Sequence, residues 1–191
     1  MSKGKFDIIG ILQEHGAILD GHFQLPSGFH SQTYIQTSIV LQYPTIAQKI
    51  AKEMAKRFNQ EINVVISPNP AVIGIGQEIA RIKNARSIFT EKVEGVMVLK
   101  RNFKINENES VLIVDDVFST GKICSQVISL VRNYKAKVIG IAAIIDRSTG
   151  ELPFLNVPVR ALASYPLELF TPDNCPLCRK QIPLTIISPS K

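Results

Sequence analysis

Tryptophan is absent from this 191-residue sequence, and cysteine occurs only three times, an odd number that is too small for a disulfide-rich scaffold. The longest wholly apolar stretch, residues 138–145, falls well short of the ~20 residues that cross a bilayer. Asp7 follows the basic N-terminal residues and interrupts any signal-peptide core. These absences argue against a secreted scaffold and a membrane protein, and we expect a reduced, cytoplasmic protein with no membrane partner.

Long runs of one charge are also missing, although the chain is basic. Lys and Arg number 22 against 16 Asp and Glu, which gives a net charge of +6 and a pI near 9.3. The basic residues are scattered, no run reaches five, and no aromatic residues interleave with them. Such an excess suits either a nucleic acid or a small polyanionic substrate, and the composition alone gives no support for a nucleic-acid partner. The missing basic run, together with the sugar-phosphate site predicted at residues 115–121, leads us to expect no nucleic-acid partner.

Helical and strand patterns alternate through the middle of the chain. Apolar residues recur at i, i+3 and i+4 in residues 44–58, 74–83 and 123–134, which predicts three amphipathic helices. Short apolar runs predict strands at residues 64–66, 87–90, 96–99, 111–114 and 138–145. This order predicts an α/β fold with a mainly parallel sheet of five to six strands flanked by helices.

The two ends of the chain differ from this pattern. Residues 1–43 contain one short helical pattern followed by strand-like segments, and residues 151–191 hold seven of the eleven prolines. Proline disrupts helix interiors, so no long helix is expected there. We predict one domain over residues 1–191, with a core at about 44–150 and a small hood formed by residues 1–43 and 151–191.

The most informative segment is the end of the strand predicted at residues 111–114. Two carboxylates, Asp115 and Asp116, follow the strand, and Ser119, Thr120 and Gly121 then lead into a helix. Ligands of open α/β sheets bind at the carboxyl ends of strands, and a helix N-terminus favours phosphate. Carboxylates accept hydrogen bonds from vicinal hydroxyls. The segment therefore predicts a sugar-phosphate site.

Alternative interpretations of this segment are weaker. A simple helix cap would leave the two acids without partners, which is costly after a buried strand. The P-loop pattern fails because Ile123 follows Lys122 and because Asp116 stands where its first glycine should be. The dinucleotide fingerprint is missing after this strand, and a phospho-acceptor domain would need an acceptor Asp after a later strand, where only Asp146 occurs.

Histidine and cysteine give no clear metal site in the sequence. His15, His22 and His30 have no other ligand types at metal spacing and are interpreted as structural or surface residues. Cys175 and Cys178 supply half of a tetrahedral zinc site, for which a structural turn is the favoured interpretation and a zinc shared across a dimer the alternative. We predict no protein-held metal ligands, and we expect Cys124 to pack in the core.

Residues 111–121 (VLIVDDVFSTG) resemble the phosphoribosyl pyrophosphate signature of type I phosphoribosyltransferases. Residues 21–31 (GHFQLPSGFHS), 144–148 (IIDRS), 175–178 (CPLC) and 182–184 (IPL) are similar to the shorter bacterial orotate phosphoribosyltransferases. The resemblance covers about residues 5–187. It implies the type I fold, a homodimer, and Mg²⁺-dependent transfer of the phosphoribosyl group to orotate, giving orotidine 5′-monophosphate and pyrophosphate.

The resemblance also implies roles for individual residues. Asp115 and Asp116 would hold the ribose hydroxyls, and Lys92 would be the catalytic cation of a basic loop that reaches a neighbouring subunit, with Lys100 a weaker candidate. Arg147 suits a planar anionic base because its guanidinium is a fork of donors. The residues expected to bind substrate are Val117, Phe118, Ser119, Thr120, Gly121, Lys122, Ile123 and Arg147.

The sequence departs from the family pattern in four places. Ser119 and Thr120 replace the more common Thr-Thr or Thr-Ala but keep the hydroxyl, Pro26 lies where longer relatives have lysine, and the basic loop is short. Ala71 and Val72 replace two glycines of the diphosphate loop, where side chains are expected to obstruct the diphosphate. Two alternative functions therefore stay open: transfer to another base, and a catalytically weak regulator that binds phosphoribosyl pyrophosphate.

Overall fold

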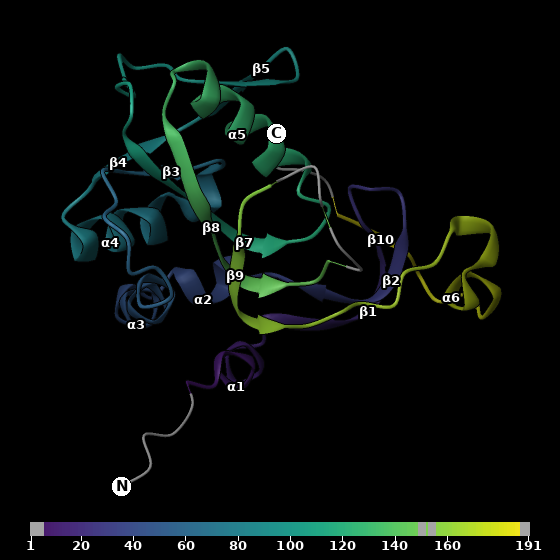
Figure 1. The fold of residues 1–191 in the computed structure, drawn as a ribbon. Helices are drawn as coiled ribbons and strands as arrows, with labels where there is room; N and C mark the ends of the chain where they lie inside the picture. The colour runs from purple at the N-terminus through teal and green to yellow at the C-terminus, as the bar shows by residue number, and fades with distance from the viewer. Residues whose placement is uncertain (1–5, 149–151, 153–155, 188–191) are drawn as a thin grey trace, which may run out of the picture.

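The computed structural model describes residues 6–148, 152 and 156–187, and its centre is a five-stranded sheet (Figure 1). The strands run in the order β4-β3-β7-β8-β9, and every neighbouring pair is parallel. Their bounds are β3 Val64–Ser67, β4 Arg86–Phe89, β7 Ser110–Phe118, β8 Lys137–Asp146 and β9 Val159–Ser164. The predicted mainly parallel sheet of five to six strands is confirmed.

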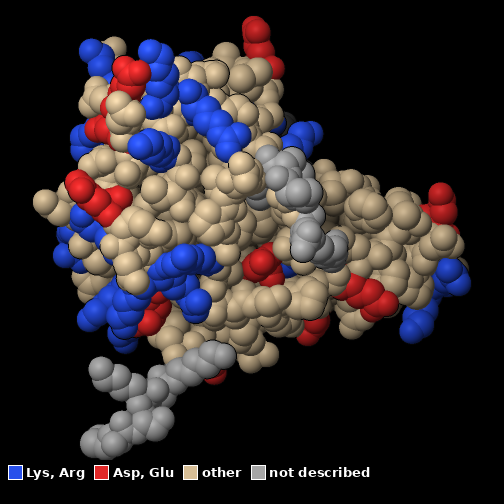
Figure 2. Space-filling view, viewed as in Figure 1, with Lys and Arg blue, Asp and Glu red and all other residues tan. Residues whose placement is uncertain are grey.

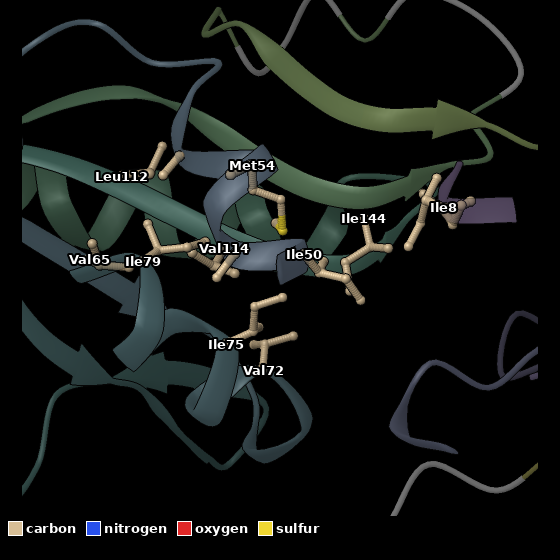
Figure 3. Packing of buried hydrophobic residues seen from close by; sticks show 14 of the residues in the cluster. Ile8, Ile50, Met54, Val65, Val72, Ile75, Ile79, Leu112, Val114 and Ile144 are labelled. Carbon is tan, nitrogen blue, oxygen red and sulfur yellow. The ribbon is translucent and has the colours of Figure 1, made fainter. Parts of the chain in front are cut away.

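Helices cover both faces of this sheet. One face carries α1 (Ile8–Glu14), α3 (Pro44–Ala55) and α4 (Ile73–Lys83), and the other carries α5 (Lys122–Asn133). Strand β7 shows why both faces are apolar, since Leu112 and Val114 pack with the first cluster and Val111 and Ile113 with the second. Figure 3 shows the first cluster, in which Ile50 and Met54 of α3 face the strands.

The three long helices lie where the apolar spacing placed them, but two strands differ from the prediction. Strand β7 continues to Phe118, so Asp115 and Asp116 lie within the strand and not after it. Residues 159–164, which the sequence analysis placed in the hood, form the edge strand β9 of the main sheet. The alternation there is too weak to see from the sequence because every residue of Val159–Ser164 is only half-buried or exposed.

The hood is a second, smaller sheet built from both ends of the chain. Its strands run in the order β10-β1-β2, with bounds β1 Ile18–Gln24, β2 His30–Ile35 and β10 Thr185–Ile186. The short helix α6 (Pro176–Arg179) lies beside this sheet at the right of Figure 1. The predicted contribution of both ends to one hood is confirmed, apart from β9.

The remaining elements are short. They are a hairpin of β5 (Glu91–Val93) and β6 (Val96–Val98), the helix α2 (Ser38–Leu41), and two single 3₁₀ turns, η1 (Pro70–Val72) and η2 (Pro172–Asn174). The sequence analysis missed β5. In the part of the chain described by the structure, no helix has the length and apolar character needed to span a bilayer.

Basic side chains form no continuous stripe on the face in Figure 2. Lys and Arg lie in several separate groups, most of them over the main sheet and its helices, with acidic side chains beside them. A nucleic-acid backbone is usually met by clustered basic residues on one face or along one helix. The view gives no support for such a surface.

Candidate functional site

The acidic pair lies at the carboxyl end of the central strand β7. The amide of Asp116 donates to Oδ1 of Asp115 at 3.0 Å, and the thiol of Cys124 donates to Oδ2 of Asp115 at 3.6 Å. Burial, together with the neighbouring charge of Asp116, raises the pKa of Asp115 to about 7. Burial and Asp115 also raise the pKa of Cys124, which keeps it a thiol and a donor. Cys124 thus packs, as expected, and also contacts the site.

The second carboxylate is held from the hood side by a residue that the sequence analysis did not single out. The hydroxyl of Thr37, which is 2% exposed, donates to Oδ2 of Asp116 at 2.5 Å. Burial and the charge of Asp116 raise the pKa of Tyr34 on β2, while the charge of Arg147 lowers it. A lone threonine 79 positions from its partner carries no sequence signal, so only the fold could reveal this contact.

The turn between β7 and α5 has the features expected of a phosphate site. Gly121 is the N-cap residue of α5 and has a φ of +68°, a conformation that costs glycine little. Gly121 has no side chain to cap the helix, and the first-turn N–H groups of α5 lie at the positive end of the helix dipole. The Thr120 hydroxyl lies 3.5 Å from the amide of Lys122 and adds a further polar group.

Arg147 reaches the same place from the neighbouring strand. Its amide donates to the carbonyl of Phe118 at 2.9 Å, immediately after β8 ends. Burial lowers the pKa of Arg147, but a guanidinium has so high a pKa that it stays charged. The site therefore has two carboxylates, one guanidinium and a helix N-terminus at a single sheet edge.

These groups line one cavity of about 870 Å³. The hood supplies another part of its wall through Leu25, Pro26, Ser27, Phe29 and Leu169, and the loop after β3 supplies Asn69. Nine residues predicted for the site line the cavity, namely Asp115, Asp116, Val117, Ser119, Thr120, Gly121, Lys122, Ile123 and Arg147.

Two predicted site residues lie elsewhere. Phe118 is 1% exposed and packs in the core on the α5 side, so its side chain does not line the cavity. Its carbonyl contributes to the site by accepting the Arg147 amide. Lys92 lies on β5, is exposed, and does not line the cavity in this single chain. The hairpin that carries Lys92 contacts α5, where the Gln126 side chain donates to the Gly95 carbonyl at 3.4 Å.

The altered diphosphate loop does not obstruct the cavity in the way expected from its composition. The side chain of Val72 is fully buried in the core, and Ala71 lines a different hollow between α3 and α4. The loop is nevertheless poor in donors, because Asn69 Oδ1 accepts the Ala71 amide at 3.0 Å and Pro70 has no N–H. The substitution changes the available hydrogen bonds more than the available space.

The expectation that the histidines lack ligand partners is wrong for two of the three. His22 and His30 come from the hood strands and meet Cys175 and Cys178 near α6, with one donor atom from each within 4.8 Å of all the others. His15 is separate and lies 2.9 Å from the Ile11 carbonyl through Nδ1. The histidine pair and the cysteine pair are more than 140 residues apart in the sequence, so no local sequence pattern could predict that they come together.

Comparison with known proteins agrees with the class that the sheet and cavity define. The phosphoribosyl transferase domain family matches residues 36–163, a range that contains β3, β7, α5 and β8. A solved orotate phosphoribosyltransferase from Aeropyrum pernix has the same fold, with a TM-score of 0.71 and 21% identity over 83% of this chain and 93% of that one. The chain therefore belongs to the phosphoribosyl transferase domain family and has its fold.

Closer relatives narrow the class. An orotate phosphoribosyltransferase of Caldicellulosiruptor bescii is 43% identical over 177 residues, 92% of this chain and 93% of that protein. One from a Thermoanaerobacter species is 42% identical over 181 residues, 94% of this chain and 95% of that protein. The chain belongs to the orotate phosphoribosyltransferase family.

Proposed function

We propose that this enzyme transfers the phosphoribosyl group of phosphoribosyl pyrophosphate to orotate, giving orotidine 5′-monophosphate and pyrophosphate. The observation that carries the proposal is that one cavity is lined by an acidic pair, a phosphate-type turn and a guanidinium, with the hood as its further wall. Each of these groups matches one part of the two substrates. The close relatives with that name support the choice of base.

The sugar phosphate is proposed to bind along the end of β7 and the start of α5. The carboxylates of Asp115 and Asp116 accept hydrogen bonds from the ribose hydroxyls. The turn at Ser119–Gly121 and the N–H groups of α5 bind the 5′-phosphate, where the helix dipole adds attraction. Burial and the neighbouring charge of Asp116 raise the pKa of Asp115, so hydrogen-bond donors from a ligand would stabilise its ionised form.

Magnesium is part of this proposal, and the donor set of the site fits it. Mg²⁺ prefers oxygen ligands and usually binds through one or two carboxylates plus substrate phosphates. Asp115 and Asp116 are such carboxylates, and a divalent cation would offset their repulsion. When bound, the ion would supply positive charge to the pyrophosphate as it leaves.

Orotate is proposed to bind between Arg147 and the hood. The Arg147 fork matches a planar base with a carboxylate, and Ser119 adds a hydroxyl on the side of the sugar. Leu25 and Phe29 of the hood form apolar wall, which excludes water from the ring. The hood segment and Arg147 together favour an anionic pyrimidine over a neutral purine.

The catalytic power is proposed to come from position and charge, and no protein nucleophile is needed. As the bond from the anomeric carbon to pyrophosphate breaks, positive charge develops on the ribose and negative charge on the leaving group. Lys92 is our candidate for stabilising that leaving group, from the neighbouring subunit of a homodimer. We place the enzyme in the cytoplasm, because none of its three cysteines forms a disulfide.

The test is a base panel with purified protein, phosphoribosyl pyrophosphate and Mg²⁺. We expect turnover with orotate and little or none with uracil, adenine, guanine or hypoxanthine. Asp116→Asn is the control for the site and should lose turnover. A preference for another base would contradict the assignment to orotate.

A second candidate, a weak or regulatory binder of phosphoribosyl pyrophosphate, is motivated by the donor-poor loop at Asn69–Ala71. It predicts that Mg²⁺ and phosphoribosyl pyrophosphate raise the melting temperature, as any ligand specific for the folded state does, without turnover on any base. Turnover with orotate at a rate typical of enzymes, on the order of 1 s⁻¹ or more, would remove this candidate.

A further inference from the structure

Four metal-ligating side chains from distant parts of the sequence meet in the hood, away from the residues that line the cavity. His22 Nε2 lies 3.0 Å from His30 Nδ1, 3.5 Å from Cys175 Sγ and 3.7 Å from Cys178 Sγ. Cys178 Sγ also lies 3.4 Å from His30 Nδ1. His22, His30 and Cys175 are buried, and Cys178 is the most exposed of the four.

These separations have the size expected around one tetrahedral ion. With ordinary zinc–sulfur and zinc–nitrogen bonds, neighbouring donor atoms around zinc lie about 3.3–3.8 Å apart. The contacts here run from 3.0 to 3.7 Å, and all four donor atoms lie within 4.8 Å of one another. Two cysteines and two histidines form a frequent donor set of structural zinc sites, which are closed to water.

Hydrogen bonding among the four side chains is a poorer explanation. His22 Nδ1 lies 2.8 Å from the Ile182 carbonyl, and because a carbonyl only accepts, this nitrogen carries the proton. In the neutral imidazole, Nε2 then carries a lone pair and no proton. That lone pair can accept only one hydrogen bond, whereas three other metal-ligating atoms lie within 3.7 Å of it. A carbonyl that orients the outer nitrogen of a ligating histidine is also the usual support of a zinc site.

We propose that His22, His30, Cys175 and Cys178 bind one structural Zn²⁺ per chain. Both cysteines bind as thiolates, so binding releases their two protons and the charges of the ion and its ligands cancel. Zinc is favoured over Mg²⁺ because two sulfurs and two imidazole nitrogens are poor ligands for a hard cation. The site is separate from the magnesium of the proposed reaction.

The site would join the two ends of the chain. His22 lies on β1 and His30 begins β2, while Cys175 is the N-cap residue of α6 and Cys178 lies within that helix. In the described residues the backbone pairing between these parts is short: β10 pairs with β1 over two registered positions, and His30 forms an isolated bridge with Phe170. The Ser31 hydroxyl adds one hydrogen bond to the Glu168 carbonyl at 3.2 Å. An ion with ligands on both sides fixes this arrangement far more strongly.

The loop between the two histidines explains why that arrangement matters. Leu25, Pro26, Ser27 and Phe29 lie between His22 and His30 in the sequence, and all four line the substrate cavity. Holding both ends of this loop orders the wall of the cavity before substrate arrives, which lowers the entropic cost of binding. The zinc site therefore positions the hood and takes no part in the chemistry.

The direct test is the metal content of the full-length protein. Cells are grown with added zinc, the protein is purified without chelators, and zinc is measured by mass spectrometry. We expect about one zinc per chain in the wild type. Cys178→Ser and His30→Ala should each lower the stoichiometry, or weaken zinc about tenfold or more in chelator competition.

Two matched controls identify the ligands. His15→Ala removes the one histidine outside the group, and Cys124→Ser changes the one cysteine outside it. Both should keep the wild-type zinc content. Cobalt reconstitution of the wild type should give the visible spectrum of tetrahedral Co²⁺ with thiolate charge-transfer bands, and these bands should weaken in Cys178→Ser.

Hydrogen exchange measures the structural role independently of turnover. Removing the metal should speed amide exchange in residues 22–30 and 175–187 and leave α5 unchanged. Wild-type protein that holds no stoichiometric zinc after reconstitution, or a disulfide between Cys175 and Cys178 without reductant, would overturn the proposal. Zinc that binds without changing exchange in the hood would overturn its positioning role. A protein that binds zinc but does not use orotate would support this site and contradict only the proposed reaction.

Discussion

At the scale of single residues, the site depends on how two adjacent carboxylates are kept in one strand. Asp115 accepts hydrogen bonds from the Asp116 amide and the Cys124 thiol, whereas Asp116 accepts one from the Thr37 hydroxyl on the hood side. The two acids thus differ in environment, and Asp115 titrates far above its ordinary value. This asymmetry leads to two predictions.

The first prediction concerns pH. The folded-state pKa of Asp115, about 7, lies above its ordinary value of 3.8, so folding favours the protonated acid. Its stabilising contribution is complete below that ordinary value and is lost as the pH rises to about 7. Relative to Asp115→Asn, the wild-type protein without ligand should therefore lose stability across this window, by an amount on the order of a few kcal/mol. Urea denaturation of both proteins at several pH values measures it, and parallel curves would contradict the prediction.

The second prediction concerns Thr37. Thr37→Val keeps the shape but leaves Asp116 without its buried donor, and a lost hydrogen bond to a charged group costs about 1.5–3 kcal/mol. If Asp116 must be oriented to hold the ribose, kcat/KM for phosphoribosyl pyrophosphate should fall roughly tenfold or more. Thr37→Ser retains the hydroxyl and should stay within a few-fold of the wild type. Equal kinetics in the valine and serine variants would remove the role of this contact.

At the scale of elements, the sheet edge that carries the site depends on the register of β7 and β8. The pairing shifts between Val111 and Leu112, opposite the stretch from Val138 to Gly140. Beyond this irregularity the strands pair regularly up to Phe118 and Asp146, which brings Arg147 beside the acidic pair. Gly140, at this irregularity, lies close to the Phe58 ring and the Pro158 carbonyl.

The third prediction tests this close approach. A Cβ at Gly140 would lie 2.5 Å from a ring carbon of Phe58 and 2.9 Å from the Pro158 carbonyl oxygen, so backbone must shift. Gly140→Ala should lower the free energy of unfolding by about 1–3 kcal/mol. Gly74→Ala is the matched control, because a Cβ at Gly74 meets nothing within 4 Å, and it should be neutral or slightly stabilising. Thermal melts of both variants decide, and equal melting temperatures would contradict the close packing.

At the scale of the whole molecule, the cation proposed for the leaving group, Lys92, does not line the cavity of this single chain, although Lys122 and Arg147 do. Lys92 is exposed on the β5–β6 hairpin, and its neighbour Glu91 forms an ion pair with Arg101 at 2.8 Å. A second subunit is the natural source of that cation if the enzyme is a homodimer.

The fourth prediction follows from this arrangement. Lys92→Ala and Asp116→Asn should each be nearly inactive alone. If Lys92 acts in the neighbouring site, unfolding and refolding the two variants together at equal amounts should restore about a quarter of the wild-type rate, because half the dimers are mixed and each has one intact site. Lys100→Ala in place of Lys92→Ala is the control and should keep most of its activity alone. No recovery in the mixture would show that Lys92 acts within its own chain or not at all.

The features that the sequence by itself determined are local ones. Each of them lies within a short stretch of sequence. They are the helices α3, α4 and α5, the buried strands β3, β7 and β8, and the two acids followed by a Ser-Thr-Gly turn. Periodicity and turn chemistry act over that distance, so they leave a readable pattern. The resemblance to a known family then extended the prediction to Arg147 and to the base.

Tertiary structure alone decided the contacts between distant segments. Thr37 contacts Asp116 although the two are 79 positions apart in the sequence, and His22 contacts Cys175 although they are 153 positions apart. The edge strand β9 joins the main sheet although its mostly half-buried residues show no alternation in burial. Such contacts depend on how the hood folds back over the sheet, and a pair of residues brought together by chain folding has no spacing that a linear pattern could reveal.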